Sequence, residues 1–255
     1  MEQCTLDSFT FVQDIQGLSL SSKFKISFDV EGLFTNIPLE ECIDLAVGYI
    51  SHGNSELKLG STELKSFFSI ATTQTHFLVK GSFYDQLDGV AMGSPLTPVL
   101  VNLLMGHHET YAWKIGKAQR YCCWQYILFI LFAKQCATIV NYVNSTHPNI
   151  RFTGEKQTDH KILFLDVLTN DDTYIPVTSV YQNFTGLLTN YLSFIPYPYK
   201  LGLVCTFVDR AYKINNTWLG FHKGIKKLIE ILKKNLFSAH LLERVVNWYL
   251  TLTHN

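Results

Sequence analysis

The residue whose position is best suited to chemistry is a carboxylate near the start of the sequence, Asp29. Apolar side chains occupy every second position from Phe24 to Val30 and alternate with polar ones, which predicts a half-buried strand with Asp29 on its polar face near the end. An oxygen ligand at a sheet rim suits a hard cation such as Mg²⁺. A lone aspartate at a strand end is more often a solvated or capping residue, so Asp29 does not identify a site by itself.

A second segment of unusual composition follows some sixty residues later. Residues 89–98 read GVAMGSPLTP, with Gly93, Ser94 and Pro95 at the centre. Glycine there permits close backbone approach to a ligand, although a Gly-Ser-Pro sequence is usually only a turn.

The two segments together resemble motifs A and B of a reverse transcriptase palm. Residues 27–38 (SFDVEGLFTNIP) carry the first motif and residues 89–98 the second, and the pattern is most similar to that of Penelope-like retroelements. The resemblance extends over residues 24 to 250 and includes the segments 83–89, 147–150, 164–167 and 189–194. It implies an RNA-directed DNA polymerase, a nucleotidyltransferase that binds an RNA or DNA primer-template and a deoxynucleotide triphosphate.

The resemblance assigns expected roles to individual residues. Asp29 matches the first carboxylate of a centre with two Mg²⁺ ions, and the backbone carbonyl of Val30 matches a further ligand. Phe34 matches an aromatic gate against a ribose 2′-hydroxyl. The loop that packs on template and incoming nucleotide matches Gly93, Ser94 and Pro95.

The third palm motif, a Tyr-x-Asp-Asp at a hairpin tip, is missing. Residues 124–132 read WQYILFILF and contain no carboxylate. Either residues 124–127 replace the motif, or its aspartates are deleted between Ile127 and Leu128; the apolar register favours the deletion, after which the hairpin must shorten or become one strand. Asp29 alone holds Mg²⁺ weakly, because the hydrated ion gives up its waters reluctantly. We therefore predict an inactive palm; the alternatives are a retained nucleic-acid-binding module and an active polymerase that uses other carboxylates.

Other acidic residues are weak substitutes for the missing pair. Asp171 and Asp172 lie in a polar run between two strands, which predicts a solvated turn. Asp166 follows an apolar strand and has a structural interpretation, and Asp85 and Asp88 are expected in or beside a hairpin.

The predicted elements indicate an α+β fold, because helices and antiparallel strands are interleaved without a βαβ rhythm. Helices are expected after Pro38, after Ser61, from Thr97, over 134–145 and beyond Pro198. Strands are expected at 149–155, 161–168 and 175–182, and a hairpin over 75–87 turns at residues 80 and 81. We divide the chain into a weakly patterned remnant (1–22), a palm-like domain of antiparallel sheet and packed helices (23–195) and a helical, thumb-like region (196–255). Fingers are largely absent, which is typical of a fragment of a longer element.

A basic amphipathic helix is expected in the thumb-like region. Ile225, Leu228 and Leu232 form an apolar stripe, and the lysines fall outside it. The four that are candidates for contact with a nucleic-acid backbone are Lys226, Lys227, Lys233 and Lys234. A solvated charged face is the competing interpretation.

Composition limits the remaining classes of function and of cellular location. The 255 residues are 47% hydrophobic and carry 21 basic and 21 acidic side chains, so attraction to phosphate requires local clustering of charge. The six cysteines have neither zinc-site nor disulfide spacing, and the vicinal pair Cys122 and Cys123 is expected to be reduced. The sequence has no signal peptide and no apolar run of membrane-spanning length, which predicts an intracellular, nuclear or cytoplasmic protein without a membrane partner.

Overall fold

The computed structural model describes residues 7–18, 20, 23–53, 59–73, 76–87, 89–112, 119–123, 126–131, 136–172, 175–181 and 188–253. Side chains are described for these residues outside 109–138. The chain forms two compact units, one built from Ile26–Glu155 and one that combines the N-terminal segment up to Lys25 with Lys156–Asn255. The boundary that the sequence suggested near residue 196 stays a prediction.

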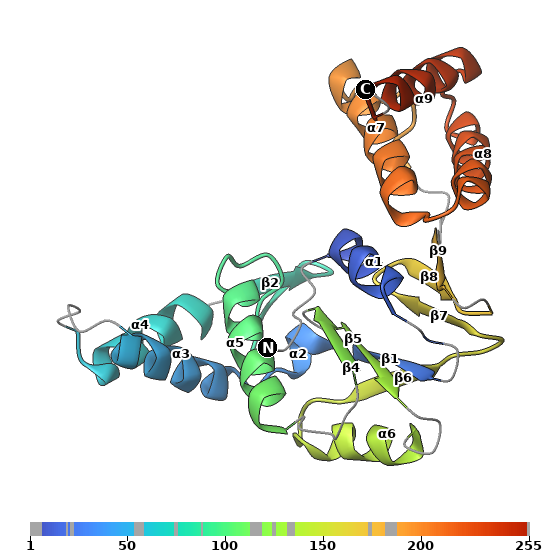
Figure 1. The fold of residues 1–255 in the computed structure, drawn as a ribbon. Coiled ribbons are helices and arrows are strands. Elements are labelled where there is room, and N and C mark those ends of the chain that lie inside the picture. Colours follow the sequence, from blue (N-terminus) through green and yellow to red (C-terminus); the bar gives the residue numbers. More distant parts are fainter. Residues whose placement is uncertain are drawn as a thin grey trace. The chain divides into compact units, whose positions relative to one another are not determined.

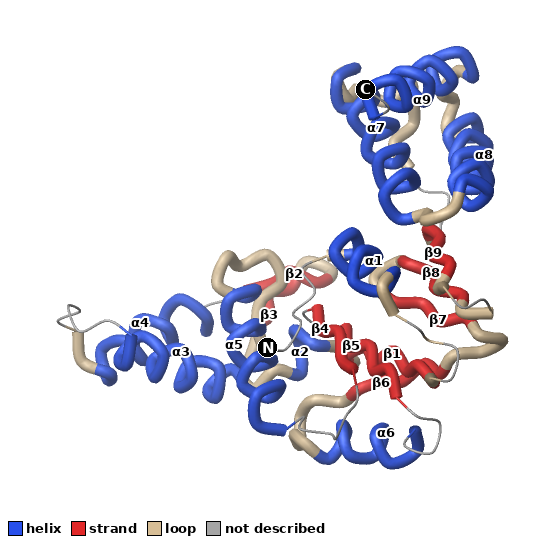
Figure 2. The backbone as a smooth tube through the Cα atoms, in the orientation of Figure 1, coloured by secondary structure: helices blue, strands red, loops and turns tan. Residues whose placement is uncertain are grey.

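A four-stranded sheet supports the first unit, with the order β4-β5-β1-β6 (Figure 2). Its strands are β1 (Phe24–Val30), β4 (Gln119–Cys123), β5 (Tyr126–Leu131) and β6 (Phe152–Lys156). Helix α6 (Cys136–Ser145) is tied to β6 by Asn144, whose side chain bonds both the N–H and the C=O of Phe152. Phe28 packs edge-on against Phe152, so β1 and β6 share an apolar face.

The remaining elements of the first unit are mainly helical (Figure 1). They are α2 (Leu33–Asn36), α3 (Leu39–Gly53), α4 (Ser61–Thr73) and α5 (Thr97–Ala112), with α3 in contact with both α4 and α5. The predicted hairpin is confirmed as β2 (His76–Val79) and β3 (Ser82–Asp85). Lys80 and Gly81 both have positive φ, as the tight turn of a two-residue hairpin requires.

The second unit contains a three-stranded antiparallel sheet in the order β7-β8-β9. Its strands are β7 (Lys161–Phe164), β8 (Val167–Asn170) and β9 (Val177–Val180). The prediction of one strand over 161–168 is wrong, because Leu165 and Asp166 adopt positive φ and turn the chain between β7 and β8.

The helices of the second unit are α1 (Ser8–Gln16), α7 (Tyr197–Ile214), α8 (Trp218–Lys234) and α9 (Ala239–Thr253). The expectation of a weakly patterned start missed α1, which Asp7 caps through the N–H groups of Phe9 and Thr10. Phe11 of α1 packs edge-on against Phe164 of β7. A cluster that includes Val208, Phe221, Leu228 and Leu242 forms the core between α7, α8 and α9. Separate helical and antiparallel parts confirm the predicted α+β class.

Candidate functional site

Asp29 lies near the end of β1 with an unsatisfied carboxylate. Its Oδ1 is buried and accepts no hydrogen bond from the described residues, while its backbone carbonyl accepts from the Thr153 hydroxyl at 3.3 Å. Burial raises the pKa of Asp29, the Val30 N–H opposes the rise, and the charge of Glu155 adds to it. No cation found among the described side chains pairs with this carboxylate.

Glu155 shares the sheet face of Asp29. The N–H of Glu31 donates to the Arg151 carbonyl and the N–H of Gln157 donates to the Lys25 carbonyl, so β1 and β6 run antiparallel. That register places Thr153 opposite Asp29 and Glu155 two residues further along β6, on the same face. Glu155 is exposed, and the sequence pattern gave no sign of this pairing, since it depends on strands more than 120 residues apart.

The strand next to β1 belongs to the hairpin that should carry the third motif. β4 pairs antiparallel with β5, and Cys123 opposes Tyr126, so Trp124 and Gln125, which lie outside the described residues, connect the strands. The predicted gap between Ile127 and Leu128 falls inside β5, where these residues pair with Cys122 and Tyr121.

Of the two outcomes expected for this hairpin, the two-stranded form is retained, so it has not become one strand. The choice between deletion and replacement of the aspartates stays a prediction. The segment 119–131 contains no Asp or Glu.

The segments of motifs A and B meet at Phe34. The N–H of Val90 donates to the Phe34 carbonyl at 2.8 Å. Gly89 has φ +79°, and a Cβ there would lie 2.7 Å from the same carbonyl oxygen, so this contact requires glycine. Gly93 also has positive φ but has open space around its Cα, while the N–H of Ser94 donates to the Ala91 carbonyl and shapes the loop. The roles predicted for Val30, Phe34, Gly93, Ser94 and Pro95 stay predictions.

Lys25, on the same strand as Asp29, is buried in an ion pair. Its side chain is fully buried, and Nζ lies 2.5 Å from Oδ2 of Asp171, which is itself only 4% exposed. Two expectations are therefore wrong: β1 is not half-buried, because Lys25 and Ser27 are buried, and Asp171 is not in a solvated turn. Burial lowers the pKa of Lys25, and Asp171 offsets part of the effect.

The structure also places the other candidate carboxylates. Asp166 binds Arg210 at 3.0 Å, and Asp85 pairs with His76 across the β2–β3 hairpin. Asp88 lies outside the described residues. Asp171, Asp166 and Asp85 each have a partner of their own, and Asp172 is exposed.

These observations decide whether the residues fit a two-metal centre. The orphaned, buried oxygen of Asp29 fits one cation ligand, with Glu155 as the other acidic group on that face. A centre with two Mg²⁺ ions needs several converging carboxylates, and β4, β5 and their connection supply none. The residues present do not fit the two-ion centre that the resemblance implies.

The basic helix is confirmed as α8. Phe221, Ile225, Leu228 and Leu232 are buried on one face, whereas Lys223, Lys226, Lys227, Lys233 and Lys234 are exposed. The helix carries five lysines and one glutamate, Glu230. No ion pair found among the described residues involves these lysines, so their charge is directed to solvent.

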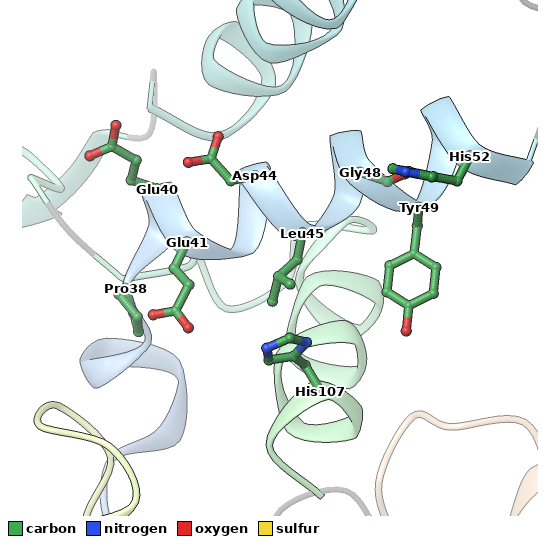
Figure 3. Close-up of a pocket in the computed structure, with 9 residues that line it drawn as sticks. All are labelled: Pro38, Glu40, Glu41, Asp44, Leu45, Gly48, Tyr49, His52 and His107. Atoms are coloured by element: carbon green, nitrogen blue, oxygen red, sulfur yellow. The ribbon is translucent and has the colours of Figure 1, made fainter. Parts of the chain in front are cut away.

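A pocket on α3 was not predicted. It has a volume of about 920 Å³, and Figure 3 shows acidic and histidine side chains around it. The lining residues are Pro38, Glu40, Glu41, Asp44, Leu45, Gly48, Tyr49, His52 and His107. Glu41 also contacts His147 and lies near His108, two histidines that the sequence motifs did not bring together.

Comparisons with known proteins support the fold. The chain matches telomerase from Candida albicans with a TM-score of 0.61 and 11% identity, over 96% of this chain and 47% of that chain. It matches apo telomerase from Candida Tropicalis with a TM-score of 0.55 and 12% identity, over 96% and 45%. A Sicinivirus RNA-dependent RNA polymerase matches with a TM-score of 0.53 and 12% identity, over 97% and 55%.

These similarities show a polymerase-like fold, and the chain spans about half the length of each protein. Residues 187–247 match the model of the animal helix-turn-helix domain, which corresponds to α7, α8 and most of α9. A search of curated proteins returned no match. None of the helices that the structure describes combines the length and hydrophobicity needed to span a bilayer.

Proposed function

We propose that this chain is the polymerase-like part of a Penelope-like reverse transcriptase that has lost nucleotidyl transfer. The observation that carries the proposal is the position of Asp29 beside a hairpin without carboxylates. Its orphaned oxygen is what a former metal ligand leaves behind when its partners are lost. The polymerase-like fold supports the lineage, and the motifs at 27–38 and 89–98 support the Penelope-like assignment.

Positioning groups are retained although the carboxylates are not. The contact of Gly89 and Val90 with Phe34 holds the proposed nucleotide-binding loop against the motif A turn. Paired Mg²⁺ ions, which Asp29 would hold together with further carboxylates, would supply activation of a 3′-oxygen and stabilisation of a triphosphate. With Asp29 and the exposed Glu155 alone, we expect one weakly held cation and no productive pair.

Primer extension on an RNA template, with Mg²⁺ or Mn²⁺, tests this proposal. We expect no product from the unaltered chain. Replacement of Tyr126 and Ile127 by aspartates restores the acidic pair at the positions that the ungapped comparison aligns with it, and we expect extension only from this variant. Product formation by the unaltered chain that disappears in Asp29→Ala would refute the loss of activity.

A second function, retained binding of nucleic acid, is favoured by α8. Its lysines are exposed and free of ion pairs among the described residues, and positive side chains on a helix contact phosphates in a sequence-independent way. The similarity of residues 187–247 to a helix-turn-helix domain supports the same surface. The telomerase from Candida albicans was solved with a fragment of telomeric RNA, which agrees with an RNA or DNA primer-template as partner of this chain.

Fluorescence anisotropy with a labelled RNA–DNA duplex tests this second function. Each phosphate contact contributes about 0.9 to the magnitude of the negative slope of log K against log salt concentration. Loss of four contacts therefore reduces this magnitude by about 3 to 4. We expect that decrease when Lys226, Lys227, Lys233 and Lys234 become glutamates. Reversal of Lys23 and Lys156, two lysines away from α8, provides the control. Binding that does not depend on salt, or an equal loss in the control, would contradict it.

A further inference from the structure

Three side chains from separate segments of the first unit converge at the N-terminal end of α3. Glu41 lies in the first turn of α3, His108 on α5 and His147 in the loop that follows α6. One ligand atom from each lies within 4.8 Å of the other two. Nε2 of His147 is 3.0 Å from one Glu41 oxygen, and Nε2 of His108 is 3.8 Å from the other.

We propose that Glu41, His108 and His147 bind a divalent transition-metal ion of the zinc class. Two imidazoles and one carboxylate form a donor set that suits Zn²⁺, whereas Mg²⁺ prefers oxygen ligands alone. Ligand atoms about 2.1 Å from a tetrahedral ion lie about 3.4 Å apart, and the observed separations require only small side-chain movements. The proposal concerns a different place in the first unit from Asp29 and does not depend on polymerase activity.

His108 provides the first independent support. Its Nε2 is buried and has no hydrogen-bond partner among the described residues, and its side chain is 12% exposed. Burial lowers the pKa of His108, with His147 lowering it further and Glu41 opposing the change. An unbonded imidazole nitrogen beside a carboxylate is destabilising without a ligand and is stabilised by a cation.

His147 shows how the chain must change when the ion binds. Its Nδ1 accepts the N–H groups of Asn149 and Ile150 at 3.1 and 3.2 Å, so the proton of the neutral ring lies on Nε2 and points to Glu41. The ion takes the place of this proton, the ring adopts the tautomer protonated at Nδ1, and the two amides lose their acceptor. Metal binding therefore leaves a specific signature at residues 149 and 150.

The geometry also suggests access to the ion. Glu41 lines the pocket of about 920 Å³ on α3, and three protein ligands leave a fourth position for water. Since the ligands are 41, 108 and 147 in the sequence, the ion joins α3, α5 and the loop after α6, and its binding raises the melting temperature of the chain.

Isothermal titration of the tag-free full chain with Zn²⁺, after treatment with a chelator, tests the site. We expect one ion per chain, no competition from millimolar Mg²⁺, and movement of the Asn149 and Ile150 amide resonances. Glu41→Gln, His108→Gln and His147→Asn should each weaken binding by roughly tenfold or more. His147→Asn keeps an acceptor for the two amides while it removes Nε2, so a folded variant is expected.

The matched control is His107→Gln, since His107 is adjacent to His108 and lines the pocket but is outside the cluster. We expect it to keep the affinity and the Zn²⁺-induced rise in melting temperature, which the three ligand variants lose. Circular dichroism of the metal-free variants confirms that each is folded. Unchanged Zn²⁺ affinity in the three ligand variants, an equal loss in His107→Gln, or a thiolate charge-transfer band with Co²⁺ would each overturn the proposal.

Discussion

The two ends of β1 each carry an ionisable side chain, but the surroundings of the two side chains differ. Lys25 is fully buried and its charge is neutralised by Asp171 at 2.5 Å. Asp29, four residues later, keeps an oxygen that is buried and unbonded, and burial raises its pKa. Among the residues with described side chains, a counter-charge is present at the first position and none is found at the second, which distinguishes a structural charge from one suited to an external cation.

The largest expected loss of stability comes from removing the ion pair that neutralises Lys25 in β1. Asp171→Ala leaves the Lys25 ammonium buried without a partner, and removal of one member of a buried pair costs about 3–5 kcal/mol of unfolding free energy. Urea denaturation measures the loss. The matched control is Asp172→Ala, an exposed neighbour, where we expect a change within about 0.5 kcal/mol. Equal effects of the two changes would show that Asp171 does not neutralise a buried charge.

An intermediate loss of stability is expected from substitution of Gly89, where the motif B segment contacts the turn that follows Asp29. Gly89→Ala combines positive φ with a Cβ 2.7 Å from the Phe34 carbonyl, so we expect a loss of about 2 kcal/mol or more. Gly93→Ala shares the positive φ but has open space around it, and it should cost about 1 kcal/mol. Comparison of the thermal and urea unfolding of the two variants separates the cost of the close Cβ contact at residue 89 from the cost of positive φ, which both variants share. A smaller loss at Gly89 than at Gly93 would mean that the motif A–B contact is not formed.

The smallest expected effect is a gain in stability, not a loss. Asp29→Asn removes a partly buried charge without a partner and should stabilise the chain by about 1 kcal/mol at pH 7. Because the folded pKa lies above the unfolded value of 3.8, the destabilisation by Asp29 is present above the folded pKa and disappears as the pH falls toward 3.8. The gain from Asn should therefore decrease over the same interval. Urea unfolding from pH 4 to 7 measures it, with exposed Glu31→Gln as control; a gain that grows on acidification would contradict the raised pKa.

Local patterns predicted the elements better than they predicted burial. The apolar stripe of α8 and the β2–β3 turn were found because their determinants lie within a few residues. The burial of Lys25 was missed because its partner Asp171 is 146 residues away. The β7–β8 turn was missed because Leu165 and Asp166, neither of them glycine, adopt positive φ.

The candidate site was predictable to a similar extent. Motif spacing identified Asp29 and the loop around Gly93, since these are continuous segments. The proximity of Glu155 to Asp29 and the convergence of Glu41, His108 and His147 depend on strand register and helix packing that the sequence does not state. The register of β4 and β5, which places the connection of the hairpin at residues 124 and 125, was likewise not predictable from the apolar run.

The measurement that tests the unpaired state of Asp29 most directly is Mn²⁺ binding by the unaltered chain and by the Tyr126→Asp/Ile127→Asp variant. Background from the histidine cluster is removed by carrying Glu41→Gln in both. We expect weak binding of at most one ion by the unaltered chain, two ions with at least tenfold tighter binding in the variant, and loss of that gain on Asp29→Ala. Tight binding of two ions by the unaltered chain, lost on Asp29→Ala, would contradict the conclusion that Asp29 has no carboxylate partners for a two-metal centre.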